Sequence, residues 1–408
     1  MRHRRTLFQD APAFMKTFMI APTFALTPAL ALTFMSVCLL VVTSTPLSTQ
    51  ANQRSSARTN PSVARQAAVL PTASMSIERM AHTATTLRDG RVLVAGGFVN
   101  ERSAVHSAQS YSPVTERFAS LPRMITVRHS HSATLLPSGK VLLVGGFVEG
   151  NTTTTTAELF DPVSNTFSAA GALRSPRAGH IAVLLRNGLV LIAGGVGPDW
   201  QFLSSAELYD PATGRFMPTG GMTVARESHK AVLLHDGRVL IAGGHRGRRA
   251  DIILYTSAEV YEPNNGAFRR VGDMSTRRHK HDAVLLQDGR VLITGGSDER
   301  DNEGAYTSTE LFDPRVDAFT KGPAMRLARY KHAGSSVLLS SGVIVVAGGA
   351  AYAEAFDPRT STFALVDGDG SLAGQFSSVT TVSGQRVLIT GGYGNGGGPR
   401  SLAWLYRP

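Results

Sequence analysis

The sequence predicts an all-β fold built from seven similar repeats, and three observations support this. The doublet Gly-Gly closes a short apolar run seven times, ending at Gly97, Gly146, Gly195, Gly244, Gly296, Gly349 and Gly392. The doublets recur about every fifty residues, a period typical of propellers and solenoids. In the fourth repeat the apolar runs flank Asp236-Gly237, a strong signal for a tight hairpin.

Residues 216–263 show the plan of one repeat. The run HKAVLLHDGRVLIAGG predicts two strands, SAEVYEP predicts a third after a loop of variable length, and the segment around Phe268 completes a fourth. Four short antiparallel strands per repeat form a propeller blade. We therefore expect a seven-bladed β-propeller, with the second strand apolar on both faces because sheets pack on either side of it.

The repeat register predicts how the ring closes. An aromatic residue stands thirteen positions before the repeated histidine, and Val69 holds that place before His82. At the other end, Pro408 aligns with the proline that follows the third strand of earlier repeats. The seventh repeat therefore lacks a fourth strand, and we expect residues 66–73 to supply it, which removes exposed sheet edges.

The repeated motifs resemble those of kelch repeats. These motifs are the Gly-Gly doublet, Arg-x-x-His before the first strand, A-E-[LVA]-[YF]-[DE]-P in the third, and the aromatic residue that follows. The resemblance covers roughly residues 66–408 and is greatest to the bacterial, galactose-oxidase-like branch. The last repeat departs most, with Ala373 for Arg, Phe376 for His and Trp404 for Glu.

The resemblance implies that Arg-x-x-His lies beside the central channel. Its members are Arg79, Arg128, Arg177, Arg226, Arg278 and Arg329, with His82, His131, His180, His229, His281 and His332. They form either a ring around an anionic ligand or part of the scaffold. We favour the scaffold, because a residue found in nearly every blade usually serves the blade. The arginines can pair with glutamates of the third strands, Glu158, Glu207, Glu259, Glu310 and Glu354.

The unlike loops after the doublets are better candidates for binding, since binding residues concentrate on loops held by a rigid scaffold. We expect these loops to share a face with the Arg-x-x-His segments. There the fourth and fifth repeats would form a basic patch beside aromatic residues, suited to an anionic glycan or a protein partner. Its predicted members are Trp200, Phe202, His245, Arg246, Arg248, Arg249, Tyr255, Arg277, Arg278 and Lys280. The alternative is a solvated rim neutralised by Asp298, Glu299, Asp301 and Glu303.

The N-terminal segment indicates export. Arg2, Arg4 and Arg5 precede a mostly apolar stretch over residues 18–42, the pattern of a secretory signal. We expect residues 1–51 to be a signal peptide, or else an uncleaved membrane anchor. Residues 52–65 are expected to be a flexible linker, and residues 66–408 the propeller. The protein would then be a monomer that is secreted, periplasmic or at the cell surface, with no nucleic-acid partner.

Composition bears on the function classes. The formal net charge is +11, and basic secreted surfaces often meet anionic glycans. A copper-radical oxidase of the galactose oxidase type needs a Tyr–Cys cross-link, and the one cysteine, Cys38, lies in the N-terminal segment, which excludes that activity from an exported chain. We predict no cofactor, metal site or catalytic residue. A binding module is favoured over a carbohydrate-active enzyme at the channel mouth or a structural surface protein.

Overall fold

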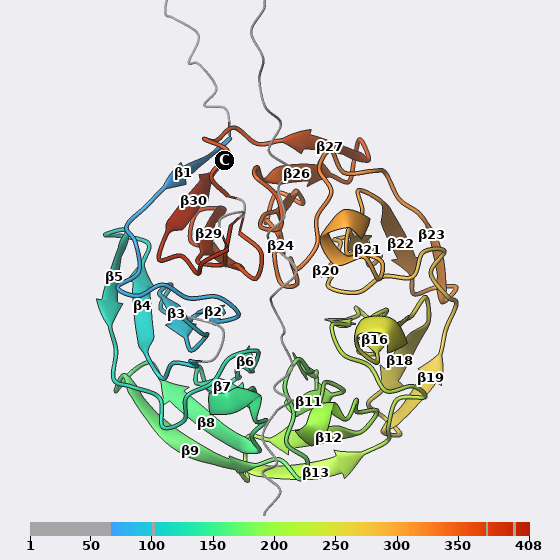
Figure 1. The fold of residues 1–408 in the computed structure, drawn as a ribbon, viewed down its shortest axis with the longest axis horizontal. Coiled ribbons are helices and arrows are strands. Elements are labelled where there is room, and N and C mark those ends of the chain that lie inside the picture. The colour runs from blue at the N-terminus through green and yellow to red at the C-terminus, as the bar shows by residue number, and fades with distance from the viewer. Residues whose placement is uncertain (1–66, 100–102, 373, 395–396) are drawn as a thin grey trace, which may run out of the picture. The chain divides into compact units, whose positions relative to one another are not determined.

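The computed structural model describes residues 67–99, 103–372, 374–394 and 397–408. The expected signal peptide or anchor, the linker and Cys38 lie outside these residues. Within the compact unit Val63–Pro408, seven four-stranded antiparallel sheets are arranged around a central axis, as Figure 1 shows. The prediction of a seven-bladed all-β propeller with four strands per blade is confirmed.

Each blade runs outward from the axis. The first three contain β2 (Thr83–Thr86), β3 (Val92–Ala95), β4 (Ala108–Ser112) and β5 (Arg117–Ser120); β6 (Ser132–Leu135), β7 (Val141–Val144), β8 (Thr156–Asp161) and β9 (Thr166–Ala172); and β10 (Ile181–Leu184), β11 (Val190–Ala193), β12 (Ala206–Asp210) and β13 (Arg215–Thr219). The next two contain β14 (Lys230–Leu233), β15 (Val239–Ala242), β18 (Ala258–Glu262) and β19 (Ala267–Arg270); and β20 (Asp282–Leu285), β21 (Val291–Thr294), β22 (Thr309–Asp313) and β23 (Ala318–Lys321). The last two contain β24 (Ser336–Leu338), β25 (Ile344–Val346), β26 (Glu354–Asp357) and β27 (Thr362–Leu365); and β28 (Ser378–Val382), β29 (Arg386–Thr390), β30 (Ala403–Arg407) and β1 (Ala68–Pro71).

The core lies between blades. The second strand of each of the first six blades is buried along its whole length. In blade 7 the second strand, β29, is buried along its last four residues. Side chains from two neighbouring blades share one cluster, as Leu191 of blade 3 and Ile241 of blade 4 do. The apolar character of both faces of this strand follows from this position, because each sheet packs against two others.

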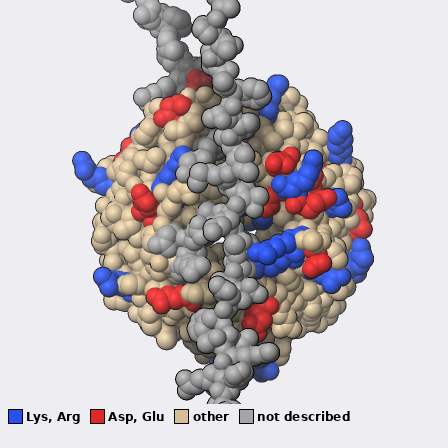
Figure 2. All heavy atoms as spheres, viewed as in Figure 1, with Lys and Arg blue, Asp and Glu red and all other residues tan. Residues whose placement is uncertain are grey.

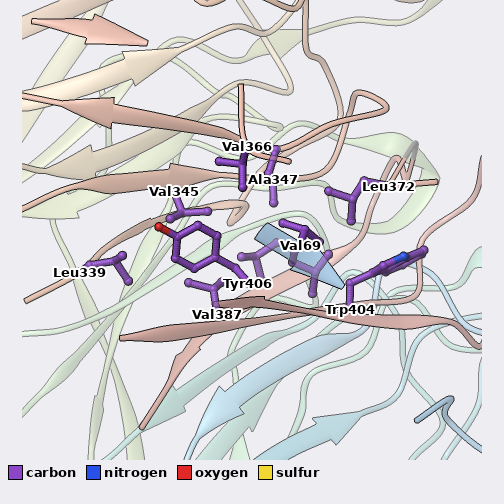
Figure 3. Packing of buried hydrophobic residues seen from close by; sticks show 12 residues of the cluster. Val69, Leu339, Val345, Ala347, Val366, Leu372, Val387, Trp404 and Tyr406 are labelled. Atoms are coloured by element: carbon purple, nitrogen blue, oxygen red, sulfur yellow. The ribbon is translucent and has the colours of Figure 1, made fainter. Parts of the chain in front are cut away.

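The ring closes as the register predicts. Strand β1 pairs antiparallel with β30, which places Val69 opposite Tyr406 and Pro71 opposite Trp404. Figure 3 shows Val69 lying among Tyr406, Trp404 and Ala347, and only 2% of its surface is exposed. The first described strand therefore completes the last blade, and no separate fourth strand is needed after β30.

Ion pairs reinforce the same seam. Glu116, in the turn after β4 of blade 1, accepts hydrogen bonds from Nη2 of Arg407 at 2.7 Å and from Nη1 of Arg386 at 3.3 Å. Both arginines belong to blade 7, so this carboxylate joins the first and last blades. Because the three side chains are partly exposed, we expect these ion pairs to stabilise the closed ring less than the β1–β30 pairing does.

The Gly-Gly doublets allow adjacent backbones to meet. Gly243 and Gly244 have φ values of +63° and +87°, a region that favours glycine. A Cβ at Gly243 would lie 2.6 Å from the carbonyl oxygen of Arg278 and 2.8 Å from Cε1 of His281, both in the next blade. The doublet is therefore a packing requirement of the scaffold, not a ligand-binding motif.

A belt of backbone hydrogen bonds surrounds one end of the channel. Each blade contributes the residue at the second variable position of Arg-x-x-His. Most of these residues donate the backbone N–H to the backbone carbonyl of the equivalent residue in the preceding blade. These bonds run from Ser130 to Ala81 (3.0 Å), Gly179 to Ser130 (3.0 Å), Lys280 to Ser228 (3.1 Å), Phe376 to Lys331 (2.8 Å) and Ala81 to Phe376 (3.2 Å). We call this belt and the loops after the doublets the channel mouth.

The loops of blades 2 to 5 carry the irregular structure of the mouth. They contain the short 3₁₀ helices η1 (Glu149–Asn151), η2 (Pro198–Trp200), η3 (Arg249–Asp251) and η4 (Asp301–Gly304), and the small ribbon β16 (His245–Arg246) with β17 (Ile253–Leu254). Bridges such as Glu227 to His245 and His279 to Ser297 join the loops to the Arg-x-x-His segments. The expected shared face is confirmed. In the described part of the chain, no helix has the length and apolarity that crossing a membrane requires.

Candidate functional site

The repeated arginines lie inside the blades. Arg226 has no exposed surface, donates to the carbonyl of Gly243 at 2.8 Å, and pairs with Oε1 of Glu259 at 2.8 Å. Glu259 also accepts the backbone N–H of Thr223 at 2.7 Å, which ties the segment between blades to strand β18. Equivalent pairs are Arg128–Glu158, Arg177–Glu207, Arg278–Glu310 and Arg329–Glu354.

These contacts support the scaffold role of the arginines and correct one assignment. Arg278, expected in the ligand-binding patch, is fully buried and paired with Glu310 at 3.0 Å, so it belongs to the ring of structural arginines. In blade 1, Gln109 replaces the glutamate and accepts from Arg79 at 3.4 Å. Burial without a carboxylate partner lowers the pKa of Arg79 to about 10.

The repeated histidines lie between blades. Four of them contact a hydroxyl group of the preceding blade through Nε2: His82 with Thr390, His131 with Thr83, His180 with Ser132 and His332 with Thr294. Burial lowers the pKa of His180 to about 3 and that of His332 to about 4, from an ordinary value of 6.5. These histidines are therefore neutral structural groups at neutral pH.

The buried histidines predict acid lability. Because the pKa of each is lower in the folded than in the unfolded chain, the unfolded state binds more protons once the pH falls below about 6.5. Stability should therefore be greatest above that pH and decline steadily toward pH 5, by about 1.4 kcal/mol per pH unit for each histidine fully in this regime. Urea midpoints at pH 7.5, 6.5, 5.8 and 5.0 measure the slope. A urea midpoint that stays constant or rises as the pH falls from 7.5 to 5.0 contradicts the lowered pKa values of the buried histidines.

The channel mouth brings together five titratable groups from blades 4 and 5. Oε2 of Glu227 lies 3.3 Å from Nε2 of His245, and Nδ1 of His245 lies 3.2 Å from Nδ1 of His279. Nε2 of His279 lies 3.3 Å from Oδ1 of Asp301, which pairs with Nζ of Lys280 at 2.6 Å. The groups thus form a continuous row from Glu227 to Lys280.

The surroundings shift the pKa values of the two carboxyl groups and the two imidazoles. Burial raises the pKa of Glu227 and lowers that of His245 to about 3. Burial also lowers the pKa of His279. Asp301 is desolvated too, but His279 and Lys280 outweigh this and hold its pKa well below the usual range. The row therefore contains one carboxyl group whose pKa is raised by burial, Glu227, and one whose pKa is lowered by neighbouring groups, Asp301.

Aromatic rings continue around the mouth from blade 1 to blade 3. Ring centroids are 4.6 Å apart for Phe98 and His129, 5.2 Å for His129 and Phe147, and 5.3 Å for Phe147 and Trp200. The guanidinium carbon of Arg248 lies 3.3 Å from the centroid of Trp200, while 36% of Trp200 stays exposed. The aromatic side of the mouth thus ends at a cation from blade 4.

Blades 6 and 7 add a lysine among aromatic rings. Nζ of Lys331 donates to the hydroxyl of Tyr393 at 2.7 Å. It lies 5.0 Å from the ring centroid of Tyr330, 5.5 Å from that of Phe376 and 5.4 Å from that of Tyr393. Burial lowers the pKa of Lys331 to about 8. Phe376 forms part of this surface. Its backbone hydrogen bonds place it at the second variable position of the repeat, so Gly374 and Ser377, not Ala373 and Phe376, stand where the Arg and His were expected.

The predicted patch residues lie in different surroundings. Phe202 packs edge-on against His245 at 5.6 Å, so the aromatic and titratable parts of the mouth meet there. Tyr255 lies near Arg226 and Arg246, which lower its pKa against the larger raising effect of burial. Arg249 is the first residue of η3, in the loop that also carries Arg246.

Acidic side chains neutralise two of the predicted patch cations, as the alternative of a neutralised rim expects. Arg277 pairs with Glu299 at 3.0 Å, and Lys280 with Asp301 at 2.6 Å. Figure 2 shows Lys, Arg, Asp and Glu atoms gathered on this face over the part of the ring where Figure 1 labels β16, β20 and β21. The patch is therefore a mixed-charge surface.

Sequence reasoning did not identify Glu227, His279, Asp301, Lys331 or Tyr393 as members of one site. For Glu227, His279 and Lys331 the signal was present in the variable positions of Arg-x-x-His, which differ from blade to blade and line the mouth, whereas Asp301 and Tyr393 lie in the loops after the doublets. Across the four described ranges, no three His, Cys, Asp or Glu side chains are grouped so as to hold a metal ion.

Comparisons with known proteins show the fold. No protein-family model and no curated protein matches the sequence. Among solved structures, the chain is similar to a fungal alcohol oxidase of the AA5 family in complex with copper, with a TM-score of 0.69 and 15% identity over 84% of this chain and 77% of that chain. At 15% identity this likeness shows the propeller fold alone.

Proposed function

We propose that this protein is a secreted kelch-repeat propeller that binds an anionic glycan at the channel mouth. The observation that carries the proposal is the cluster of Phe147, Trp200 and Arg248, in which the two rings are tilted by 42° and the guanidinium lies over Trp200. It combines a partly exposed aromatic ring, which suits the apolar face of a sugar, with a guanidinium group, which suits a carboxylate or sulfate.

The remainder of the mouth supports the same ligand class. Lys280 and Lys331 stand on the belt of backbone hydrogen bonds, so both amines belong to the rim. Asp301 neutralises Lys280, whereas Lys331 donates to the uncharged hydroxyl of Tyr393. Glu227, whose side chain is partly exposed near Lys280 and Arg248, offers a hydrogen-bonding group of the kind that sugar hydroxyls require.

Reversing the charge of the blade 4 loop tests the proposal. The variant Arg246→Glu, Arg248→Glu, Arg249→Glu should lose at least about tenfold in affinity for an anionic-glycan column, since one charge-assisted hydrogen bond contributes about 1.5–3 kcal/mol. Retention time as a function of salt concentration measures the effect. Unchanged retention contradicts a glycan site at this loop.

A control with the same charge change separates a site from general charge. Arg117, Arg315 and Arg359 are exposed and lie at or beside the hairpins that join third and fourth strands. Reversing these three should leave retention nearly unchanged. Equal losses in both triple variants would mean that only the net charge of the protein matters.

A carbohydrate-active enzyme is the second candidate, and the row from Glu227 to Asp301 favours it. General acid–base chemistry needs a proton donor and acceptor beside the ligand, and Glu227 lies at the mouth with Arg248 and His245 nearby. Turnover of a sugar that is lost in Glu227→Gln and kept in Glu299→Gln would support the enzyme. Binding without turnover supports the module.

A further inference from the structure

Lys331 differs from other lysines of the described ranges in its polar partner. Its Nζ donates to the uncharged hydroxyl of Tyr393 at 2.7 Å. Three other lysines pair with carboxylates, at 3.2, 3.2 and 2.6 Å: Lys140 with Asp161, Lys230 with Asp282, and Lys280 with Asp301. A carboxylate partner strongly favours the ammonium form of a lysine, and a neutral hydroxyl group favours it much less.

Aromatic rings surround this amine at the channel mouth. The ring centroids of Tyr330, Tyr393 and Phe376 lie 5.0, 5.4 and 5.5 Å from Nζ of Lys331. The backbone carbonyl of Lys331 accepts the N–H of Phe376 at 2.8 Å, which fixes the lysine on the belt. Tyr330 is buried, whereas Lys331, Phe376 and Tyr393 are partly exposed. The amine therefore lies against apolar surface in a group of side chains that is accessible from the mouth.

This setting increases the share of free amine at neutral pH. Burial lowers the pKa of Lys331 to about 8, and the positive charge of Lys280 acts in the same direction. Asp301 acts in the opposite direction but does not outweigh them. Burial also raises the pKa of Tyr393, so its hydroxyl keeps its proton at neutral pH. A lysine that is desolvated beside another cation is the kind that attacks carbonyl groups.

We propose that Nζ of Lys331 forms an imine with the aldehyde group of a small hydroxyaldehyde at the channel mouth. The open-chain form of a reducing sugar carries the same group. The partly exposed rings of Phe376 and Tyr393 would lie beside the bound carbon chain, with the hydroxyl of Tyr393 near the reacting atoms. The proposal goes beyond glycan binding, because the reaction needs a free aldehyde and no anionic group.

Imine formation balances with water as its only by-product. The free amine of Lys331 attacks the carbonyl carbon, a C–N bond forms, and the carbonyl oxygen takes up a proton from nitrogen to give a carbinolamine. The C–O bond then breaks, the oxygen leaves as water with the second proton from nitrogen, and a C=N bond forms. Because the hydroxyl of Tyr393 lies 2.7 Å from Nζ, it can take the proton from nitrogen while it passes its own proton to the departing oxygen. Tyr393 is unchanged at the end, and no electrons pass to or from another molecule.

Reductive trapping with glycolaldehyde tests the proposal on the full chain. Cyanoborohydride reduces an imine to a stable secondary amine, and peptide mass spectrometry measures the adduct at each lysine. At pH 7 we expect Lys331 to be labelled about tenfold faster than the exposed Lys321, because its lowered pKa leaves far more free amine than the ordinary value of about 10.4 does. The labelling rate of Lys331 should level off above about pH 8, whereas that of Lys321 should keep rising. Labelling of Lys331 that is no faster than that of Lys321 overturns the proposal.

Variants separate the amine from its surroundings. Lys331→Arg keeps the positive charge but has no amine that forms an imine, so the fast adduct should disappear, whereas Lys321→Arg should retain it. Tyr393→Phe should label Lys331 more slowly, and an unchanged rate contradicts the proton relay. A fast adduct that persists at full rate in folded Lys331→Arg overturns the assignment to this lysine.

The test is independent of the glycan site. The variant reversed at Arg246, Arg248 and Arg249 should lose retention on the anionic-glycan column but keep the fast adduct at Lys331. Failure of glycan binding and failure of aldehyde capture are therefore separate results.

Discussion

A chain that begins at Met75 is expected to lose soluble folding altogether, because it lacks β1. Without this strand, β30 would present unpaired backbone groups along its outer edge, and Trp404 and Tyr406 would lose the cover of Val69. Open edges of this kind pair with other chains and promote aggregation. Size-exclusion chromatography and circular dichroism of the expressed protein measure the outcome.

The matched control is a chain that begins at Gln66. It removes the residues before the strand but keeps the antiparallel pairing from Ala68 to Pro71. We expect this form to be a folded monomer with the spectrum of an all-β protein. A well-behaved monomer beginning at Met75 would contradict the role of β1 in closing the ring.

Loss of a buried glutamate should have the second largest effect. Glu259→Ala leaves the fully buried guanidinium of Arg226 without its counter-ion and frees the N–H of Thr223. Removing one member of a buried pair costs about 3–5 kcal/mol, because the other charge stays in a medium of low polarity. Thermal and urea unfolding midpoints measure the loss.

Two variants control for this interpretation. Glu259→Gln retains an oxygen for Arg226, as Gln109 does for Arg79 in blade 1, and should cost less. Glu262→Ala removes an exposed partner of Arg269 and should change stability by about 1 kcal/mol or less. If Glu259→Ala lowers the stability no more than Glu262→Ala does, the buried Arg–Glu pairs do not stabilise the blades as we propose.

The sequence predicted the scaffold well because the scaffold repeats. Strand two, the doublets and the Arg–Glu pairs occur in blade after blade, so their register is visible without a structure. Even the N-terminal origin of the last blade's fourth strand was predictable, since Val69 lies thirteen residues before His82, the position that an aromatic residue occupies in the other repeats. Repetition gives each of these assignments several independent observations.

The site was less predictable for the opposite reason. His279 and Asp301 occur once each in their contexts, and only the curvature of the ring and the course of η4 bring them within 3.3 Å. Neighbouring residues also point in different directions. Arg277 is exposed and paired with Glu299, whereas Arg278 is buried within its blade, a distinction that two adjacent arginines do not reveal in a sequence.

A glycan array probed with the purified protein tests the central claim most directly. We expect selective binding to glycans that carry carboxylate or sulfate groups, with the sugars recovered unchanged. The variant reversed at Arg246, Arg248 and Arg249 should lose that binding, while the variant reversed at Arg117, Arg315 and Arg359 should keep it. Absence of binding to every acidic glycan would contradict a glycan site at the channel mouth.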